Sequence, residues 1–104
     1  DFKTGRVLML GYMNNAAYQT TLKTKRVTFW SRSRNKLWTK GETSGNYLLV
    51  KKIVLDCDQD AVLCLVKPVG STCHTGTISC FPSTLEQLEA TLNSRKQTLP
   101  KTNF

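Results

Sequence analysis

Residues 47–66 read YLLVKKIVLDCDQDAVLCLV, in which two apolar runs enclose an acidic segment. The runs, residues 47–55 and 61–66, are rich in Val, Leu and Ile, which is typical of strands. Between them, Asp56-Cys57-Asp58-Gln59-Asp60 holds three of the seven acidic residues of the chain. The pattern predicts two strands on either side of a short acidic connection.

Shorter elements are predicted before this pair. Residues 7–10 are apolar and follow Thr4-Gly5, which predicts the second arm of a hairpin whose first arm is missing, so that the N-terminal arm is truncated. Asn14 or Asn15 can cap a helix that runs to about Lys23. Residues 27–31 and 37–40 are predicted strands around a turn, and residues 41–45 form a loop bounded by glycines. The fold class is therefore α+β, with a mainly antiparallel sheet and one or two helices.

The second helix is predicted near the C-terminus. Ser83 and Glu86 form a capping box, and leucines recur at helical spacing up to about residue 95. Its apolar stripe needs a partner, which is this core, another copy, or a domain outside the chain. We therefore divide the chain into a domain of residues 1–82 and a segment of residues 83–104.

The charge distribution indicates an anionic ligand. The 104 residues carry a net charge of +8, and residues 23–52 hold nine Lys or Arg and a single acid, Glu42. Such a region attracts nucleic acid or phosphorylated small molecules. Arg32 and Arg34 are two apart and would point the same way from an extended backbone, which suits a phosphate. No apolar run is long enough for a membrane span, and no signal peptide is recognised at the start.

The acidic segment is a candidate metal site. In an extended backbone Asp56, Asp58 and Asp60 face one side and Cys57 the other. Carboxylates suit Mg²⁺ and thiolate suits zinc. Alternate residues of a strand lie about 6.5 to 7 Å apart, so a kink or bridging water is needed for one ion. A solvated acidic turn is the alternative.

Three cysteines are candidate zinc ligands. Cys57, Cys73 and Cys80 lack the short paired spacing of zinc ribbons and fingers, and three protein ligands leave zinc a fourth position for water, as in catalytic sites. Cys64 lies in an apolar run and is expected to be a small core residue. His74, the only histidine, either completes the coordination or moves protons. Disulfides are a less favoured use of the thiols than metal binding in a reducing compartment.

Five strings carry a resemblance to a known family. They are residues 7–14 (VLMLGYMN), 30–34 (WSRSR), 37–45 (LWTKGETSG), 56–60 (DCDQD) and 73–81 (CHTGTISCF). Together, and in this order, they resemble the phosphoribosyl-AMP cyclohydrolases of histidine biosynthesis over about residues 5–81.

The resemblance implies hydrolysis of the N1–C6 bond of the adenine ring of phosphoribosyl-AMP by a cytoplasmic, intertwined homodimer that uses Zn²⁺ and Mg²⁺. It implies zinc ligands at Cys57, Cys73 and Cys80, drawn from both subunits, and Mg²⁺ ligands at Asp56, Asp58 and Asp60. In that reaction His74 would shuttle protons, and the phosphorylated substrate would be bound by Arg32, Arg34, Lys40, Thr43 and Ser44. Trp30 or Trp38 would stack on the base or, as favoured, pack in the core.

Residues 83–104 resemble the opening helix and following loop of phosphoribosyl-ATP pyrophosphohydrolase, which is fused behind the cyclohydrolase in bifunctional versions. The acidic helices of that second enzyme are absent from the sequence, so we expect no pyrophosphohydrolase activity. Family members tend to have glycine near Lys25. The rival interpretations are a nucleic-acid-binding zinc module and a metal-stabilised interaction domain, but we expect neither nucleic acid nor membrane as a partner.

Overall fold

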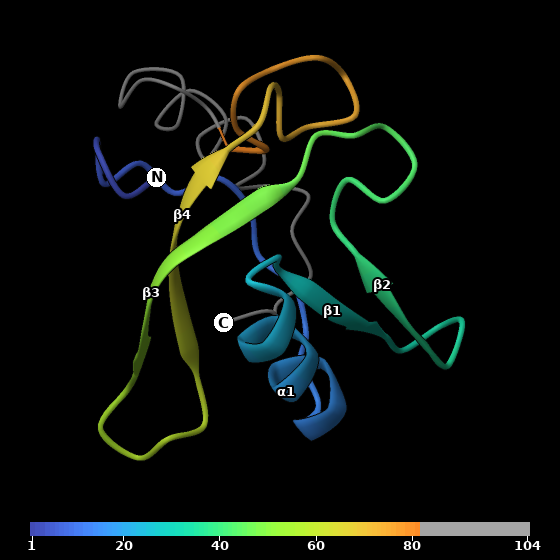
Figure 1. The fold of residues 1–104 in the computed structure, drawn as a ribbon, viewed down its shortest axis with the longest axis vertical. Coiled ribbons are helices and arrows are strands. Elements are labelled where there is room, and N and C mark those ends of the chain that lie inside the picture. The colour runs from blue at the N-terminus through green and yellow to red at the C-terminus, as the bar shows by residue number, and fades with distance from the viewer. Residues whose placement is uncertain (82–104) are drawn as a thin grey trace, which may run out of the picture.

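The computed structural model describes residues 1–81 of the chain. Within them the elements are α1 (Asn15–Thr24), β1 (Thr28–Ser31), β2 (Lys36–Thr39), β3 (Leu48–Leu55) and β4 (Val62–Pro68), as Figure 1 shows. One helix with antiparallel strands agrees with the predicted α+β class. The helix predicted over residues 83–95, and the domain boundary after residue 82, lie outside the described residues. No helix among residues 1–81 has the length and apolar character that crossing a bilayer requires.

Helix α1 begins and ends as the sequence predicts. The Asn14 side chain accepts a hydrogen bond of 2.8 Å from the Ala17 N–H, which satisfies a backbone donor of the first turn. Ala17 and Thr21 are buried against the rest of the domain. The helix stops at Lys25, whose φ of 62° is left-handed and whose N–H donates to the Thr21 carbonyl.

The strands form two hairpins rather than one continuous sheet. β1 pairs antiparallel with β2, and β3 with β4, the second ladder carrying an irregularity between Val50 and Lys52. A single bridge between Arg26 and Leu49 joins the hairpins, with the Val27 N–H donating to the Leu48 carbonyl at 3.1 Å. The hairpins therefore meet near the start of β1 and of β3, which leaves their far ends apart (Figure 1).

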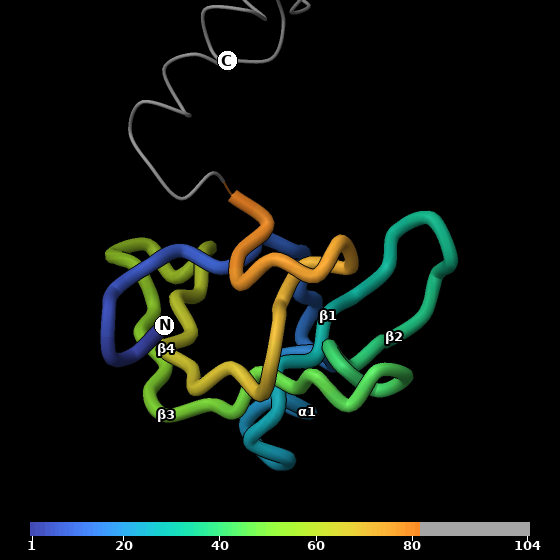
Figure 2. The backbone as a smooth tube through the Cα atoms, turned by 90° about the horizontal axis from the view of Figure 1, so that it is seen from above, coloured from blue at the N-terminus to red at the C-terminus, as the bar shows by residue number. Residues whose placement is uncertain are grey.

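Residues 7–10 do not form a strand, so the predicted hairpin arm is wrong, while the truncation of the N-terminal arm stays a prediction. Their backbone carbonyls bond to a loop instead: the Cys80 N–H donates to the Leu8 carbonyl at 2.8 Å, and the Ser79 hydroxyl donates to the Val7 carbonyl at 2.6 Å. Figure 2 shows the N-terminal trace passing beside the orange loop that follows β4. The apolar run is thus extended chain held by the loop that carries two of the cysteines.

The core is small and lies where the two hairpins meet. Phe29 stacks on Trp38 with ring centroids 5.0 Å apart, and Cys64 packs against the buried cluster, as the sequence predicts. The cluster consists of Leu8, Val27, Phe29, Leu48 and Val66. Because Leu8 belongs to it, the core also anchors the segment that holds the cysteine loop.

Candidate functional site

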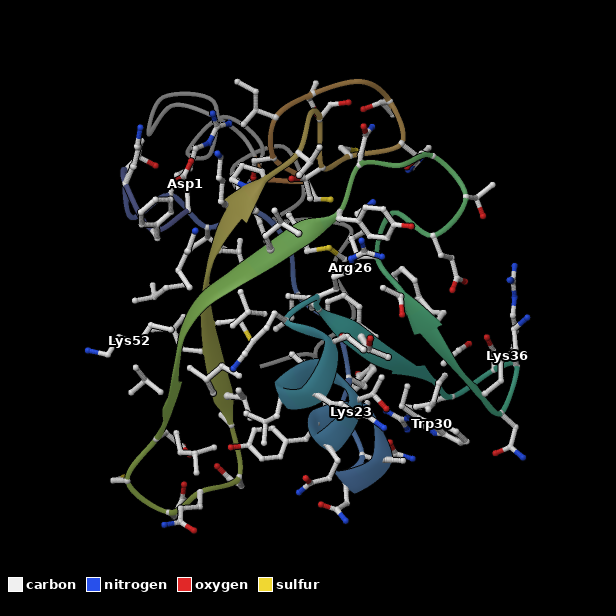
Figure 3. The ribbon with its side chains drawn as sticks, in the orientation of Figure 1. Asp1, Lys23, Arg26, Trp30, Lys36 and Lys52 are labelled. Carbon is white, nitrogen blue, oxygen red and sulfur yellow. The ribbon has the colours of Figure 1, made fainter. Side chains whose placement is uncertain are left out.

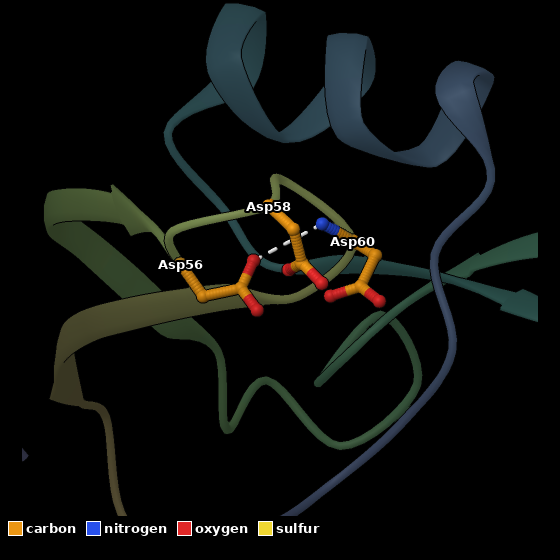
Figure 4. Close-up of side chains that lie close together, drawn as sticks. All are labelled: Asp56, Asp58 and Asp60. Carbon is orange, nitrogen blue, oxygen red and sulfur yellow. Dashed lines mark hydrogen bonds between the residues drawn. The ribbon is translucent and has the colours of Figure 1, made fainter.

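The acidic segment folds into the tight turn between β3 and β4. The Asp56 carboxylate accepts the backbone N–H of Asp60 at 3.0 Å, which Figure 4 shows as a dashed line, and that of Ala61, also at 3.0 Å. Gln59 takes a left-handed φ of 61°. As a result, oxygens of Asp56, Asp58 and Asp60 lie within 4.8 Å of one another. This turn provides the kink that the three carboxylates need in order to approach one another more closely than they would along an ideal strand.

The three carboxylates perturb one another's protonation. The Ala61 N–H is the main cause that lowers the pKa of Asp56, whereas the neighbouring side chains of Asp58 and then Asp56 raise the pKa of Asp60. Oxygens on one octahedral Mg²⁺ lie about 3 to 4 Å apart. The exposed cluster is close to that spacing, and its donor set therefore fits a hard divalent cation.

The second candidate metal-binding segment is the loop after β4. The Cys73 N–H donates to the Thr77 carbonyl at 3.1 Å and the Gly76 N–H to the Cys73 carbonyl at 2.9 Å, which folds the loop back on itself. Gly76 permits this turn with a φ of 92°. The fold brings Cys80 close to Cys73, and the Thr75 hydroxyl donates to the Cys73 sulfur at 3.1 Å.

The surroundings of the two thiols shift their pKa values in opposite directions. The Thr75 hydroxyl, followed by the Thr75 backbone N–H and the Thr77 hydroxyl, lowers the pKa of Cys73 to about 6. Burial and then the adjacent Cys73 raise the pKa of Cys80, against the cation of Lys40, which lowers it. A thiolate at Cys73 near neutral pH is the form that zinc binds.

Cys57 lies far from these two thiols in a single chain. It is exposed on the β3–β4 turn, at the other end of the hairpin from the cysteine loop. The seven residues of β4 separate the two ends by about 23 Å. Among residues 1–81, the Asp cluster is the only group of three possible ligands that comes together. The three predicted zinc ligands are therefore not assembled within one chain.

A pocket lies between the β1–β2 hairpin and the loop after β2. Its volume is about 540 Å³. The lining residues are Ser31, Arg34, Trp38, Thr39, Lys40, Gly41, Glu42, Thr43 and Ser44. Four of the five predicted substrate-binding residues are among them, so the structure brings most of that set together.

Arg32 is the predicted substrate-binding residue outside this lining. Residues 32–35 form the turn between β1 and β2, so the backbone is not extended there and the expectation that Arg32 and Arg34 share a face is wrong. The Arg32 guanidinium lies 4.7 Å from the centre of the Tyr12 ring, while Arg34 lines the pocket.

Gly41 and Glu42 shape the pocket, although the sequence predicted only that they lie in a loop and not that they belong to the site. The Glu42 carboxylate accepts the Thr39 N–H at 3.2 Å, which closes the loop after β2. Gly41 is buried with a φ of 89°, and a Cβ there would lie 2.4 Å from the carbonyl carbon of Asn46. The two glycines that bound this loop were the signal in the sequence, because a buried position with a left-handed φ accepts few residues other than glycine.

Lys40 connects the pocket with the thiols. Its side chain lines the pocket, is half-buried, and lies near enough to Cys80 to lower the pKa of that thiol. His74 is exposed on the same loop, directly after Cys73. The pocket, two thiols and an imidazole thus belong to one end of the molecule, and the carboxylates and Cys57 to the other.

Comparison with known proteins relates the chain to one enzyme family. The family model described as phosphoribosyl-AMP cyclohydrolase matches residues 9–82. The phosphoribosyl-AMP cyclohydrolase of Streptococcus mutans is 62% identical over 81 residues, which cover 78% of this chain and 74% of that protein. The histidine biosynthesis bifunctional protein HisIE of Photobacterium profundum is 52% identical over 116 residues, covering 100% of this chain and 56% of the relative. That of Escherichia coli is 52% identical over 107 residues, covering 97% and 53%.

The chain therefore spans about half the length of the bifunctional relatives. The match to the family model extends from the N-terminal segment through the pocket loop, the acidic turn and the cysteine loop. The chain belongs to the phosphoribosyl-AMP cyclohydrolase family.

Proposed function

We propose that the chain catalyses hydrolysis of the N1–C6 bond of the adenine ring of phosphoribosyl-AMP, a step of histidine biosynthesis in the cytoplasm. Water adds at C6, the bond to N1 breaks, and the ring opens. One observation carries the proposal beyond family membership: Lys40 lines the pocket, and its charge also lowers the pKa of Cys80. A nucleotide in the pocket would therefore reach the thiol-bearing loop.

The pocket residues suit a phosphorylated nucleotide. Arg34 and Lys40 offer cations for phosphate, and the hydroxyls of Thr43 and Ser44 add neutral donors. Trp38 presents an aromatic surface to the same space and is partly buried against the core. Arg32 lies outside the lining, and a role in phosphate binding there requires its side chain to leave Tyr12.

The donor sets fit two kinds of metal ion. Cys73, with a pKa of about 6, provides thiolate for zinc, and Cys80 lies beside it. The three carboxylates of the β3–β4 turn provide oxygen ligands for Mg²⁺. When bound to a protein site with an open position, zinc lowers the pKa of a bound water toward neutrality, which makes hydroxide available for hydrolysis. We assign His74 to proton transfer, because its imidazole is exposed next to Cys73.

A homodimer would complete the zinc site with Cys57 of a second copy. Exposed apolar side chains border both thiol-bearing ends: Val7, Leu10, Ile78 and Phe81 near Cys80, and Val54, Leu55 and Leu63 near Cys57. Leu10 is 85% exposed, and Ile78 and Leu63 are each 58% exposed. Such surfaces are favourable for association, and pairing the two ends would bury them while bringing the thiols together.

The alternatives of a nucleic-acid-binding or interaction module have less support. The basic residues of the middle of the chain do not all share one face, since Lys36 and Lys52 lie on opposite sides of the molecule in Figure 3. The acidic turn would also repel a nucleic-acid backbone. Generic single-stranded DNA should therefore bind weakly, while phosphoribosyl-AMP should bind and be hydrolysed.

The proposal is tested by comparing two cysteine variants. Cys73→Ala is expected to lose both bound zinc and turnover of phosphoribosyl-AMP, followed by the absorbance of the ring-opened product. Cys64→Ala is the matched control, because Cys64 packs against the core and should keep zinc and turnover. Full turnover by metal-stripped Cys73→Ala protein would refute the proposed zinc site, and no turnover by wild-type protein supplied with Zn²⁺ and Mg²⁺ would refute the proposed function.

A further inference from the structure

The loop between the two neighbouring thiols contains a chain of hydroxyl groups. The Thr75 hydroxyl donates to the Cys73 sulfur at 3.1 Å, a short contact for sulfur, and its oxygen lies 3.5 Å from that of Thr77. The Thr77 hydroxyl donates to the Ser79 carbonyl at 2.8 Å. The chain of contacts thus runs from the sulfur to Ser79.

Ser79 fixes the end of this chain to the core. It is 3% exposed, and its hydroxyl donates to the Val7 carbonyl at 2.6 Å and contacts the Leu8 carbonyl at 3.2 Å. Leu8 belongs to the buried cluster. The exposed cysteine loop is therefore attached to the core through the buried Ser79. The contacts from Ser79 through Thr77 in turn restrain the position of the Thr75 hydroxyl next to the sulfur.

The hydroxyl protons have one favourable assignment. Each hydroxyl carries a single proton, and that of Thr77 is taken by the Ser79 carbonyl at 2.8 Å. The Thr75 proton then has the sulfur at 3.1 Å as its shorter available contact, against 3.5 Å to Thr77. Thr75 consequently points a donor at Cys73.

We propose that Thr75 is a positioning residue for metal binding, whose hydroxyl orients the Cys73 sulfur toward zinc. The inference rests on the proposed zinc site. Groups that hydrogen-bond to a metal ligand fix its orientation, and their loss typically weakens metal binding about 10- to 100-fold. Thr75 itself touches neither metal nor substrate in this assignment.

The test is zinc affinity, measured on the full chain by competition with a chromophoric chelator. Thr75→Val keeps the shape of the side chain without the hydroxyl and should bind zinc about 10- to 100-fold more weakly than wild type. Thr75→Ser keeps the donor and should bind close to wild type. Thr20→Val is the matched control, because that hydroxyl bonds only to the Ala16 carbonyl in α1.

Thr77→Val gives a graded comparison. It removes the neighbour of the Thr75 hydroxyl, together with the smaller direct effect of the Thr77 hydroxyl on Cys73, but leaves the Thr75 bond to sulfur. The loss of zinc affinity should therefore be smaller than for Thr75→Val. Wild-type affinity in Thr75→Val, or an equal loss in Thr75→Ser, would overturn the role of the hydroxyl. Retention of zinc by Cys73→Ala would instead overturn the zinc site on which this inference rests, whereas the proposed function is judged by turnover of phosphoribosyl-AMP in the wild-type protein.

Discussion

Gly41→Ala tests how rigidly the pocket loop is held. Gly41 and Gly45 lie in the same loop with φ values of 89° and 82°, so alanine is strained at both, by about 1 to 2 kcal/mol. Only at Gly41 does the new Cβ meet an obstacle, 2.4 Å from the Asn46 carbonyl carbon and 2.5 Å from the Tyr47 nitrogen. At Gly45 nothing lies within 4 Å.

The difference between the two variants isolates that backbone contact. Ordinary contact begins at 3.4 Å, so the Asn46–Tyr47 backbone must move by about 1 Å in Gly41→Ala. Overpacking of this kind destabilises by about 1 to 3 kcal/mol, in addition to the strain that Gly45→Ala shares. For a domain of this size each kcal/mol lowers Tm by about 4 to 8 °C.

Thermal unfolding followed by circular dichroism measures the stability of both variants. We expect Gly41→Ala to melt clearly below Gly45→Ala, and to raise KM for phosphoribosyl-AMP because the loop lines the pocket. Equal melting temperatures for the two variants would show that the backbone at Asn46 yields freely. The proposed rigidity of the pocket would then be refuted.

Further predictions concern the helix end, the thiols and the acidic turn. Lys25→Gly should raise Tm, since it relieves a left-handed φ of 62° that is unfavourable by about 1 kcal/mol, as a thermal melt will show. In metal-free protein at pH 7, iodoacetamide should label Cys73 faster than Cys64, because the pKa of Cys73 is about 6 while burial raises the pKa of Cys64. The labelling of Cys73 should slow as the pH falls below about 6, where the thiolate becomes protonated. Peptide mass mapping measures both rates. Asp56→Asn keeps an oxygen that can accept the two N–H bonds of the turn but lowers the negative charge, so Mn²⁺ or Mg²⁺ titration should show weaker binding with little change in Tm.

Local elements were readable from the sequence because local chemistry decides them. Asn14 caps α1 through its own side chain, and the apolar runs around the acidic segment pair as β3 and β4. The need for a kink between Asp56 and Asp60 also follows from strand spacing alone. Each of these predictions depends on residues that are close in sequence.

Features that depend on distant contacts were not readable. Residues 7–10 look like a strand, but their carbonyls are taken by Ser79 and Cys80, some seventy positions later. The side-chain direction of Arg32 depends on its position in the turn and on its contact with Tyr12, and the alternation of side chains along a strand predicts neither. The separation of Cys57 from Cys73 likewise follows from β4, which is about 23 Å long and lies between them, although the spacing of three cysteines alone says nothing about which chain supplies each.

The position of Cys57 and Cys73 at opposite ends of one hairpin has a genetic consequence. If each reactive centre takes one sulfur from one protomer and two from its neighbour, a Cys57→Ala chain and a Cys73→Ala chain are each inert alone. A mixed dimer of the two variants contains one intact centre, formed by the unaltered end of each protomer, and one centre that lacks both altered cysteines. Two defective alleles should then complement each other, whereas Cys73→Ala and Cys80→Ala, which damage the same end, should not.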